Sequence, residues 1–201
     1  YLPSVGSVGD KTLVWVDRAG NEQPTAITGR PWSSPRLSPD GRRVVVNTGP
    51  LNGTGATTGE LWMYEFERRT LSRLTVNGGK WSVWSPDGTR LAYTGSRTSA
   101  GIFVVNVEGA PSERSLLPIR GGSVPLGWSP DGRFIAWTGS RHDVPRAVYR
   151  KPADGSGSDE VLFRGDLHLH LNDWSADGKT LVLPMQDPKT GPDLYTLDVA
   201  S

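Results

Sequence analysis

The sequence predicts an all-β fold built from four-stranded antiparallel blades, the architecture of a β-propeller. Three observations predict it. A segment similar to Ser-Pro-Asp-Gly occurs four times, at intervals of roughly 40 to 50 residues, a period typical of propeller blades. No stretch shows sustained helical periodicity. Glycine, proline and tryptophan are frequent, at 25, 16 and 8 of 201 residues, as many turns between short aromatic strands require. The copies are centred on residues 38–41, 85–88, 129–132 and 175–178.

Each copy contains a tight turn that leads into a strand. Proline presets one dihedral, aspartate bonds the turn backbone, and glycine accepts the positive φ that closes a hairpin. Three apolar residues follow, so both faces of the strand must be covered by neighbouring sheets. The small or β-branched middle residue favours close packing between blades, and an aspartate present in every blade is expected to belong to the fold. The apolar triplets are Val44-Val45-Val46, Leu91-Ala92-Tyr93, Ile135-Ala136-Trp137 and Leu181-Val182-Leu183.

The remaining elements are predicted from short apolar runs between turns. The expected strands begin with two outer strands of a blade, at 13–17 and 24–28, and continue with a full blade at 35–38, 42–48, 60–66 and 70–75. Two further full blades are expected over 81–118 and 125–164, and three strands follow from residue 170 onward. This gives 17 strands in four to five blades, with both ends of the chain in mid-blade. We predict one propeller domain over residues 1–201, or a piece of a longer ring, whose first and last segments meet within one chain or between chains.

Composition excludes several classes of protein. The formal net charge of +1 is too small for a protein that must neutralise many phosphates, so no nucleic-acid partner is predicted. The apolar runs are far shorter than the roughly 20 residues that span a bilayer. The sequence has no cysteine, hence no disulfide or thiol chemistry. The first residues lack the features of a signal peptide, so we expect either a removed signal or a fragment.

The repeated unit resembles that of TolB-like, or WD-like, β-propellers. The resemblance rests on Trp-Ser-Pro-Asp-Gly followed by an apolar strand, and it covers nearly the whole chain. Two longer stretches, residues 13–20 and residues 172–178 leading to 187–194, are similar to the propeller region of bacterial serine/threonine protein kinases. These resemblances imply a binding scaffold, either free in the periplasm or attached to an enzyme, and the kinase propellers usually continue for further blades.

Residues that could carry catalysis are few. No Gly-x-Ser-x-Gly elbow, phosphate-binding glycine loop or kinase signature occurs, so no enzyme activity and no cofactor are predicted. His168 and His170 would share one face of a strand, near Asp166 and Asp173, as a metal site requires. The other reading, two polar groups in a loop, is preferred, and no metal is predicted. For the turn between Asp187 and residue 193 an aspartate cap is preferred over a calcium site.

A ligand site is predicted where the loops between blades gather. Arginine binds anions with two hydrogen bonds, and tryptophan offers rigid apolar surface, so this combination suits a peptide, carboxylate or phosphate. The alternative interpretation is that the tryptophans close the ring by packing and that the basic side chains are ordinary solvated charges. The candidate ligand-binding residues are Arg30, Trp32, Lys80, Trp81, Arg120, His168 and His170.

We therefore expect a non-enzymatic binding or sensor scaffold of a bacterial extracytoplasmic protein, in the periplasm or at the cell surface. Its partner would be a protein, a peptide or a small anionic ligand, without membrane insertion, and self-association that completes the ring stays open. An alternative is an accessory propeller that gates or positions a hydrolase carried elsewhere. A third is a small hydrolase or lyase with its site at the ring axis, where His168 and His170 would bind a metal.

Overall fold

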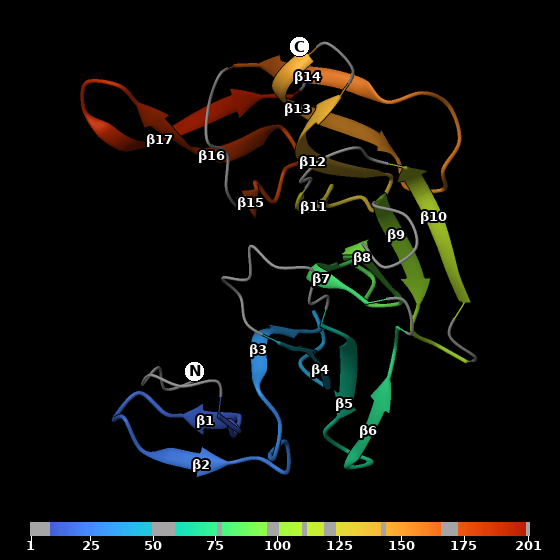
Figure 1. Cartoon of the computed structure of the whole chain (residues 1–201), viewed down its shortest axis with the longest axis vertical. Coiled ribbons are helices and arrows are strands. Elements are labelled where there is room, and N and C mark those ends of the chain that lie inside the picture. The colour runs from blue at the N-terminus through green and yellow to red at the C-terminus, as the bar shows by residue number, and fades with distance from the viewer. Residues whose placement is uncertain are drawn as a thin grey trace. The chain divides into compact units, whose positions relative to one another are not determined.

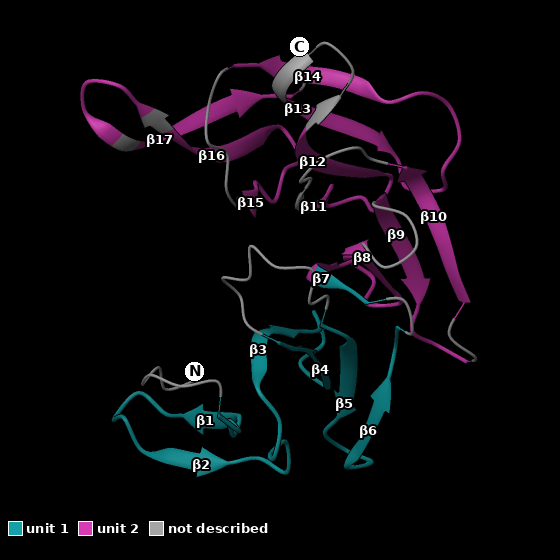
Figure 2. Ribbon diagram, in the orientation of Figure 1, with its two compact units in different colours: residues 1–80 teal, residues 81–201 magenta. Residues whose placement is uncertain are grey.

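The computed structural model of the chain describes eight ranges of residues, all built from strands and turns. None of them contains a helix long and apolar enough to cross a membrane. The chain forms two compact units, residues 1–80 and 81–201 (Figure 2). The described ranges are 9–49, 59–75, 78–95, 101–109, 112–118, 124–141, 144–165 and 173–199.

The first unit contains a hairpin and one four-stranded antiparallel sheet (Figure 1). In the hairpin, β1 (Val14–Val16) pairs with β2 (Glu22–Pro24). The sheet has its strands in sequence order, which is the order of a propeller blade. Its strands are β3 (Trp32–Leu37), β4 (Arg43–Thr48), β5 (Leu61–Glu65) and β6 (Thr70–Arg73).

The second unit contains two four-stranded sheets and one three-stranded sheet, all antiparallel and in sequence order. The first is β7 (Lys80–Trp84), which starts at the last residue of the first unit, β8 (Arg90–Gly95), β9 (Gly101–Asn106) and β10 (Ser112–Pro118). The second is β11 (Val124–Trp128), β12 (Phe134–Arg141), β13 (Val144–Pro152) and β14 (Glu160–Arg164). The third is β15 (Asp173–Trp174), β16 (Thr180–Asp187) and β17 (Gly191–Asp198). The predicted all-β propeller blades are confirmed.

The repeated turns have the predicted geometry. The glycines Gly41, Gly88, Gly132 and Gly178 have φ between 68° and 74°. In the third copy, the Gly132 N–H donates to the Ser129 carbonyl at 2.8 Å, and the Ser129 N–H donates to the Phe134 carbonyl at 2.9 Å. The Ser129 hydroxyl donates to Asp131 Oδ1 at 2.6 Å and accepts the Phe134 N–H at 2.9 Å. Serine and aspartate therefore bond the turn from inside it, which is a structural role.

The cores of the blades lie between neighbouring sheets, as the apolar triplets predict. Ala92 is fully buried in one cluster with Ile135 and Trp137 of the next blade. Ala136 is buried one blade later, in a cluster with Leu181 and Leu183. An alanine at the middle position thus faces the following blade, where a larger side chain would collide. The predicted register of these strands is confirmed.

The second strand of the hairpin differs from its prediction. It covers Glu22–Pro24 instead of residues 24–28, because the turn before it is short. Asp17 Oδ1 accepts the N–H groups of Ala19 and Asn21 at 2.8 and 2.9 Å, so pairing with β1 starts directly after Asn21. The chain then turns inward and buries Ile27 completely.

Candidate functional site

Arg30 lies on the surface of the first unit, in the connection between the hairpin and the first blade. Its carbonyl accepts the N–H groups of Lys11 and Trp32, at 2.9 and 2.7 Å, which fixes the backbone on both sides. The guanidinium carbon lies 4.2 Å from the Trp62 ring centroid and 5.6 Å from that of Trp32. The arginine therefore rests on two indoles, an arrangement that attracts a cation to the ring faces.

The two indoles form a rigid platform under Arg30. Trp32 has no exposed surface, and its Nε1–H donates to the Thr28 carbonyl at 3.3 Å. The ring of Trp62 meets Trp32 edge to face, with centroids 6.4 Å apart. In the described part of the chain, Arg30 makes no ion pair, so its N–H groups are available to an anion. Trp32 would act by positioning Arg30, since its own side chain has no accessible face.

Lys80 and Trp81 are the first two residues of β7, and both are half-buried. They were predicted in a loop between blades. Trp81 has a φ of 52°, an uncommon value for a residue with a side chain. Ser34, at the matching place in the first blade, has a φ of 48°, and β3 shifts register between Ser33 and Arg36. β11 has a comparable shift between Pro125 and Gly127. A bulge of this kind re-aims side chains at the end of a strand.

The other predicted ligand residues, Arg120, His168 and His170, lie outside the described residues. The common site of the seven candidates therefore remains a prediction. In the ranges that the structure describes, no group of three histidine, cysteine, aspartate or glutamate residues is placed to hold a metal.

Comparison with known proteins places the fold. No protein-family model matches the chain, and no curated protein matches it. TolB from Acinetobacter baumannii is similar in structure, with a TM-score of 0.73 and 20% identity over 94% of this chain and 46% of that chain. A TolB from Agrobacterium tumefaciens gives the same TM-score and identity over 96% of this chain and 72% of that one. The chain has a TolB-like propeller fold.

A third similar structure is the β-propeller domain of the trilobed protease from Pyrococcus furiosus, described as having an open velcro topology. It gives a TM-score of 0.62 at 15% identity, over all of this chain and 70% of that chain. The TolB-like chain spans about half the length of the Acinetobacter TolB. At these identities the likeness shows the fold alone.

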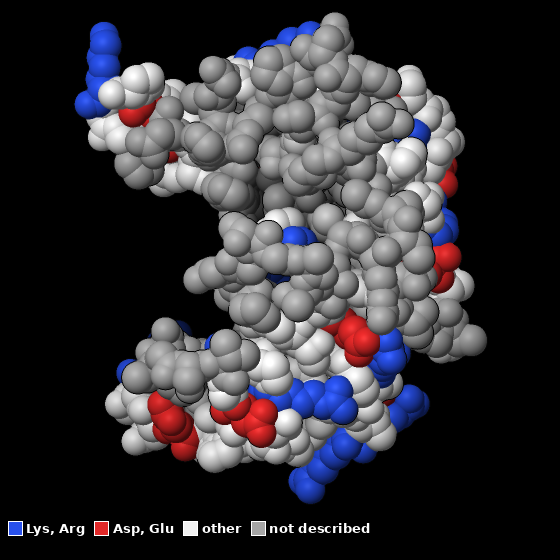
Figure 3. All heavy atoms as spheres, in the orientation of Figure 1, with Lys and Arg blue, Asp and Glu red and all other residues white. Residues whose placement is uncertain are grey.

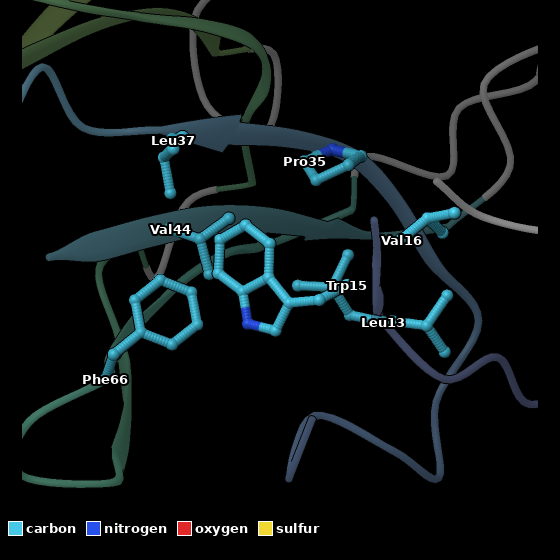
Figure 4. A pocket seen from close by; sticks show the side chains of 8 residues that line it. Leu13, Trp15, Val16, Pro35, Leu37, Val44 and Phe66 are labelled. Carbon is cyan, nitrogen blue, oxygen red and sulfur yellow. The ribbon is translucent and has the colours of Figure 1, made fainter. Parts of the chain in front are cut away.

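The TolB-like chain has a pocket in its first unit that the sequence did not predict. It has a volume of about 410 Å³, within the range of ligand sites. Figure 4 shows its lining of apolar side chains, with the Trp15 indole beside Phe66 and Val44; the Trp15 and Phe66 ring centroids lie 5.2 Å apart. Trp15 and Leu37 are each 48% exposed. The sequence carries no signal for this pocket, because the exposure of these large apolar side chains depends on how the strands pack. Its lining residues are Leu13, Val14, Trp15, Val16, Pro35, Leu37, Val44 and Phe66.

Hydrogen bonds within the turns lower the pKa values of several aspartates. The Ser129 hydroxyl, followed by the N–H groups of Arg133, lowers the pKa of Asp131 to about 2. Asp187 behaves in the same way: its Oδ1 accepts the N–H groups of Lys189 and Thr190, at 2.7 and 3.1 Å, and these bonds lower its pKa. Asp187 therefore caps this turn, as the preferred prediction expects.

Charge is distributed without large patches where the described side chains can be seen. On the face drawn in Figure 3, basic and acidic side chains lie near one another. Ion pairs such as Arg73 Nη2 with Glu60 Oε1, 2.5 Å apart, and Arg150 Nε with Glu160 Oε2, 2.7 Å apart, join neighbouring strands.

Proposed function

We propose that the chain is a non-enzymatic, protein- or peptide-binding propeller of a bacterial extracytoplasmic protein. The observation that carries this proposal is Arg30, exposed above a platform of two indoles and without an ion-pair partner in the described part of the chain. A guanidinium held at a fixed place loses little conformational freedom when it binds a carboxylate or phosphate. The ligand is therefore an acidic peptide segment, or a small anion of the same chemistry.

Three finer features belong to the same proposal. The TolB-like fold and the resemblance to propellers of bacterial serine/threonine kinases support a sensor role outside the cytoplasm. The predicted gathering of Lys80, Trp81, Arg120, His168 and His170 near Arg30 would widen the site. Self-association that completes the ring would bring such residues together at one opening.

The ligand site can be tested with acidic peptides selected from a random library on the immobilised chain. Binding is then measured by calorimetry for the wild type, for Arg30→Ala, and for Arg30→Ala combined with Arg120→Ala. We expect a loss of at least about tenfold, equivalent to roughly 1.4 kcal/mol, with unchanged thermal midpoints. Arg68→Ala is the matched control, because this arginine is 76% exposed and already paired with Glu65. Equal affinities of all variants would contradict the proposed site.

A second candidate function is an accessory propeller that positions a hydrolase. It is favoured by the similarity of the whole chain to the propeller domain of a protease. The domains encoded beside the propeller in the same gene would distinguish the two candidate functions. A peptidase domain encoded next to the propeller would support the accessory role, whereas a kinase domain and a membrane helix would support the sensor.

A further inference from the structure

The pocket of the first unit borders the strand β1. Four successive residues, 13–16, line it. Side chains alternate between the two faces of a strand, so a pocket that touches all four must lie along the edge of β1 and not over one face. β2 occupies the other edge. The pocket therefore lies where the next strand of a sheet would run.

The backbone of β1 has hydrogen-bonding groups that point toward such a strand. The Thr25 N–H donates to the Leu13 carbonyl at 2.9 Å, and the Asp17 N–H donates to the Asn21 carbonyl at 3.1 Å. In an antiparallel pair these bonds alternate along the strand, so Val14 and Val16 direct their N–H and carbonyl groups away from β2. Among the described residues no strand pairs with that edge of β1.

The floor and wall of the pocket are apolar. Pro35 and Leu37 of β3 and Val44 of β4 line one side, and Phe66, just after β5, closes an end (Figure 4). Val16 and Leu37 keep 42% and 48% of their surface exposed. An incoming strand would thus gain ladder hydrogen bonds and also cover apolar surface, the two contributions of strand addition.

The chain itself carries a strand with the matching properties. β17 is the edge strand of its three-stranded sheet in the described part of the chain. The Val199 N–H donates to the Lys179 carbonyl at 2.9 Å, and by alternation Leu194 and Thr196 direct their backbone groups to the unpaired side. Leu194 is 78% exposed, more than the other exposed large apolar residues of the described ranges.

Charge favours the same pairing. Residues 1–80 contain ten lysines and arginines against seven acidic residues, a net of +3. Residues 173–199, which include the sheet of β17, contain five aspartates against two lysines, a net of −3. Opposite net charges steer two surfaces together and disfavour pairing of each with itself.

We propose that β17 of a second copy of this chain adds to the free edge of β1 and inserts Leu194 into the pocket. The proposal rests on the self-association part of the proposed function and is independent of the Arg30 site. The two surfaces differ, so association is head to tail, and each copy keeps one free donor strand and one free pocket until the assembly closes on itself.

Sedimentation of the full chain over a wide concentration range tests the association. We expect the average mass to rise above the 21.8 kDa of one chain. Leu194→Asp should need at least about tenfold higher concentration for the same mass, because it places a charge in an apolar pocket. The matched control is Leu71→Asp, on β6 and 36% exposed, which should associate like the wild type. A mass that stays at one chain, or an equal effect of both variants, would overturn the proposal.

Cross-linking decides which chain supplies the strand. The sequence contains no cysteine, so Val16→Cys in one preparation and Leu194→Cys in another provide single thiols at exposed positions. Mixed and treated with a bis-maleimide, they should yield a covalent dimer that neither variant forms alone. A double variant that cross-links within a monomer, or no cross-link at all, would overturn the proposal. Peptide binding by the Leu194→Asp variant is measured separately and reports on the Arg30 site alone.

Discussion

Replacing Ser129 by alanine removes the centre of one turn. Ser129 is 4% exposed; its hydroxyl donates to Asp131 Oδ1 at 2.6 Å and accepts the Phe134 N–H at 2.9 Å. Each bond contributes about 1 kcal/mol, and a buried N–H left without an acceptor costs about 1–3 kcal/mol. We therefore expect a loss of about 2–3 kcal/mol in the free energy of unfolding.

Urea unfolding followed by tryptophan fluorescence measures this loss, which corresponds to a fall in the thermal midpoint on the order of 5–10 °C. Ser156→Ala is the matched control: Ser156 is exposed, and its hydroxyl also donates to an aspartate, Asp154 Oδ1, at 2.6 Å. It should change stability by less than about 0.5 kcal/mol. In Ser129→Ala, NMR titration should also show the pKa of Asp131 rising from about 2 toward 3.8. An equal, small effect of both variants would show that the serine does not hold the turn.

Three further predictions concern the blades. Gly132→Val should destabilise the chain by about 1–3 kcal/mol, because φ is 70° there. The control is Gly127→Val, at a glycine with open space around it. Equal denaturation midpoints of the two variants would contradict the role of Gly132 in the turn. Ala136→Leu should lower the free energy of unfolding by about 1–3 kcal/mol through overpacking, whereas Ala26→Leu, at an exposed position, should not. An Ala136→Leu variant with an unchanged thermal midpoint would mean that the position faces solvent. Acid should weaken the fold, because hydrogen bonds from serine hydroxyls are the main cause that lowers the pKa values of Asp40, Asp131 and Asp177. The stability that these ionised aspartates provide above about pH 4 should therefore fall toward pH 2. A circular dichroism signal that stays unchanged between these pH values would contradict this prediction.

The sequence predicts the repeated part of the fold well, because local chemistry decides it. An aspartate followed by glycine allows few turn geometries, and the turn fixes which side chains of the next strand face each neighbour. Ala92 and Ala136 therefore lie where the pattern places them. Val182 shows the limit of the pattern, since it is half-buried whereas Leu181 and Leu183 on the other face are 1% exposed. In the described part of the chain, only one face of that sheet packs on another blade.

The candidate site could be predicted only in part. Arg30 was found from its residue type, but the burial of Trp32 and the stacking on Trp62 depend on the pairing of distant strands. The pocket beside Trp15 and Leu37 was missed because apolar residues in strands are expected to be covered. Their exposure becomes visible only when the neighbouring strand of β1 is seen to be lacking in the described residues.

The self-contained turns have a consequence for how such chains change over time. The hydrogen bonds that close a Ser-x-Asp-Gly turn span at most six residues. The Ser85 N–H donates to the Arg90 carbonyl at 2.9 Å, and the Arg90 N–H donates to Ser85 Oγ at 3.0 Å. The bonds that hold each turn therefore do not depend on the neighbouring blade. Bonds between blades are made elsewhere, as by the Trp128 Nε1–H, which donates to the Val83 carbonyl at 3.3 Å. What a new blade must supply is a small residue at the middle of its second strand. Genes of this kind can lengthen or shorten by whole blades, and the surface loops are free to diverge.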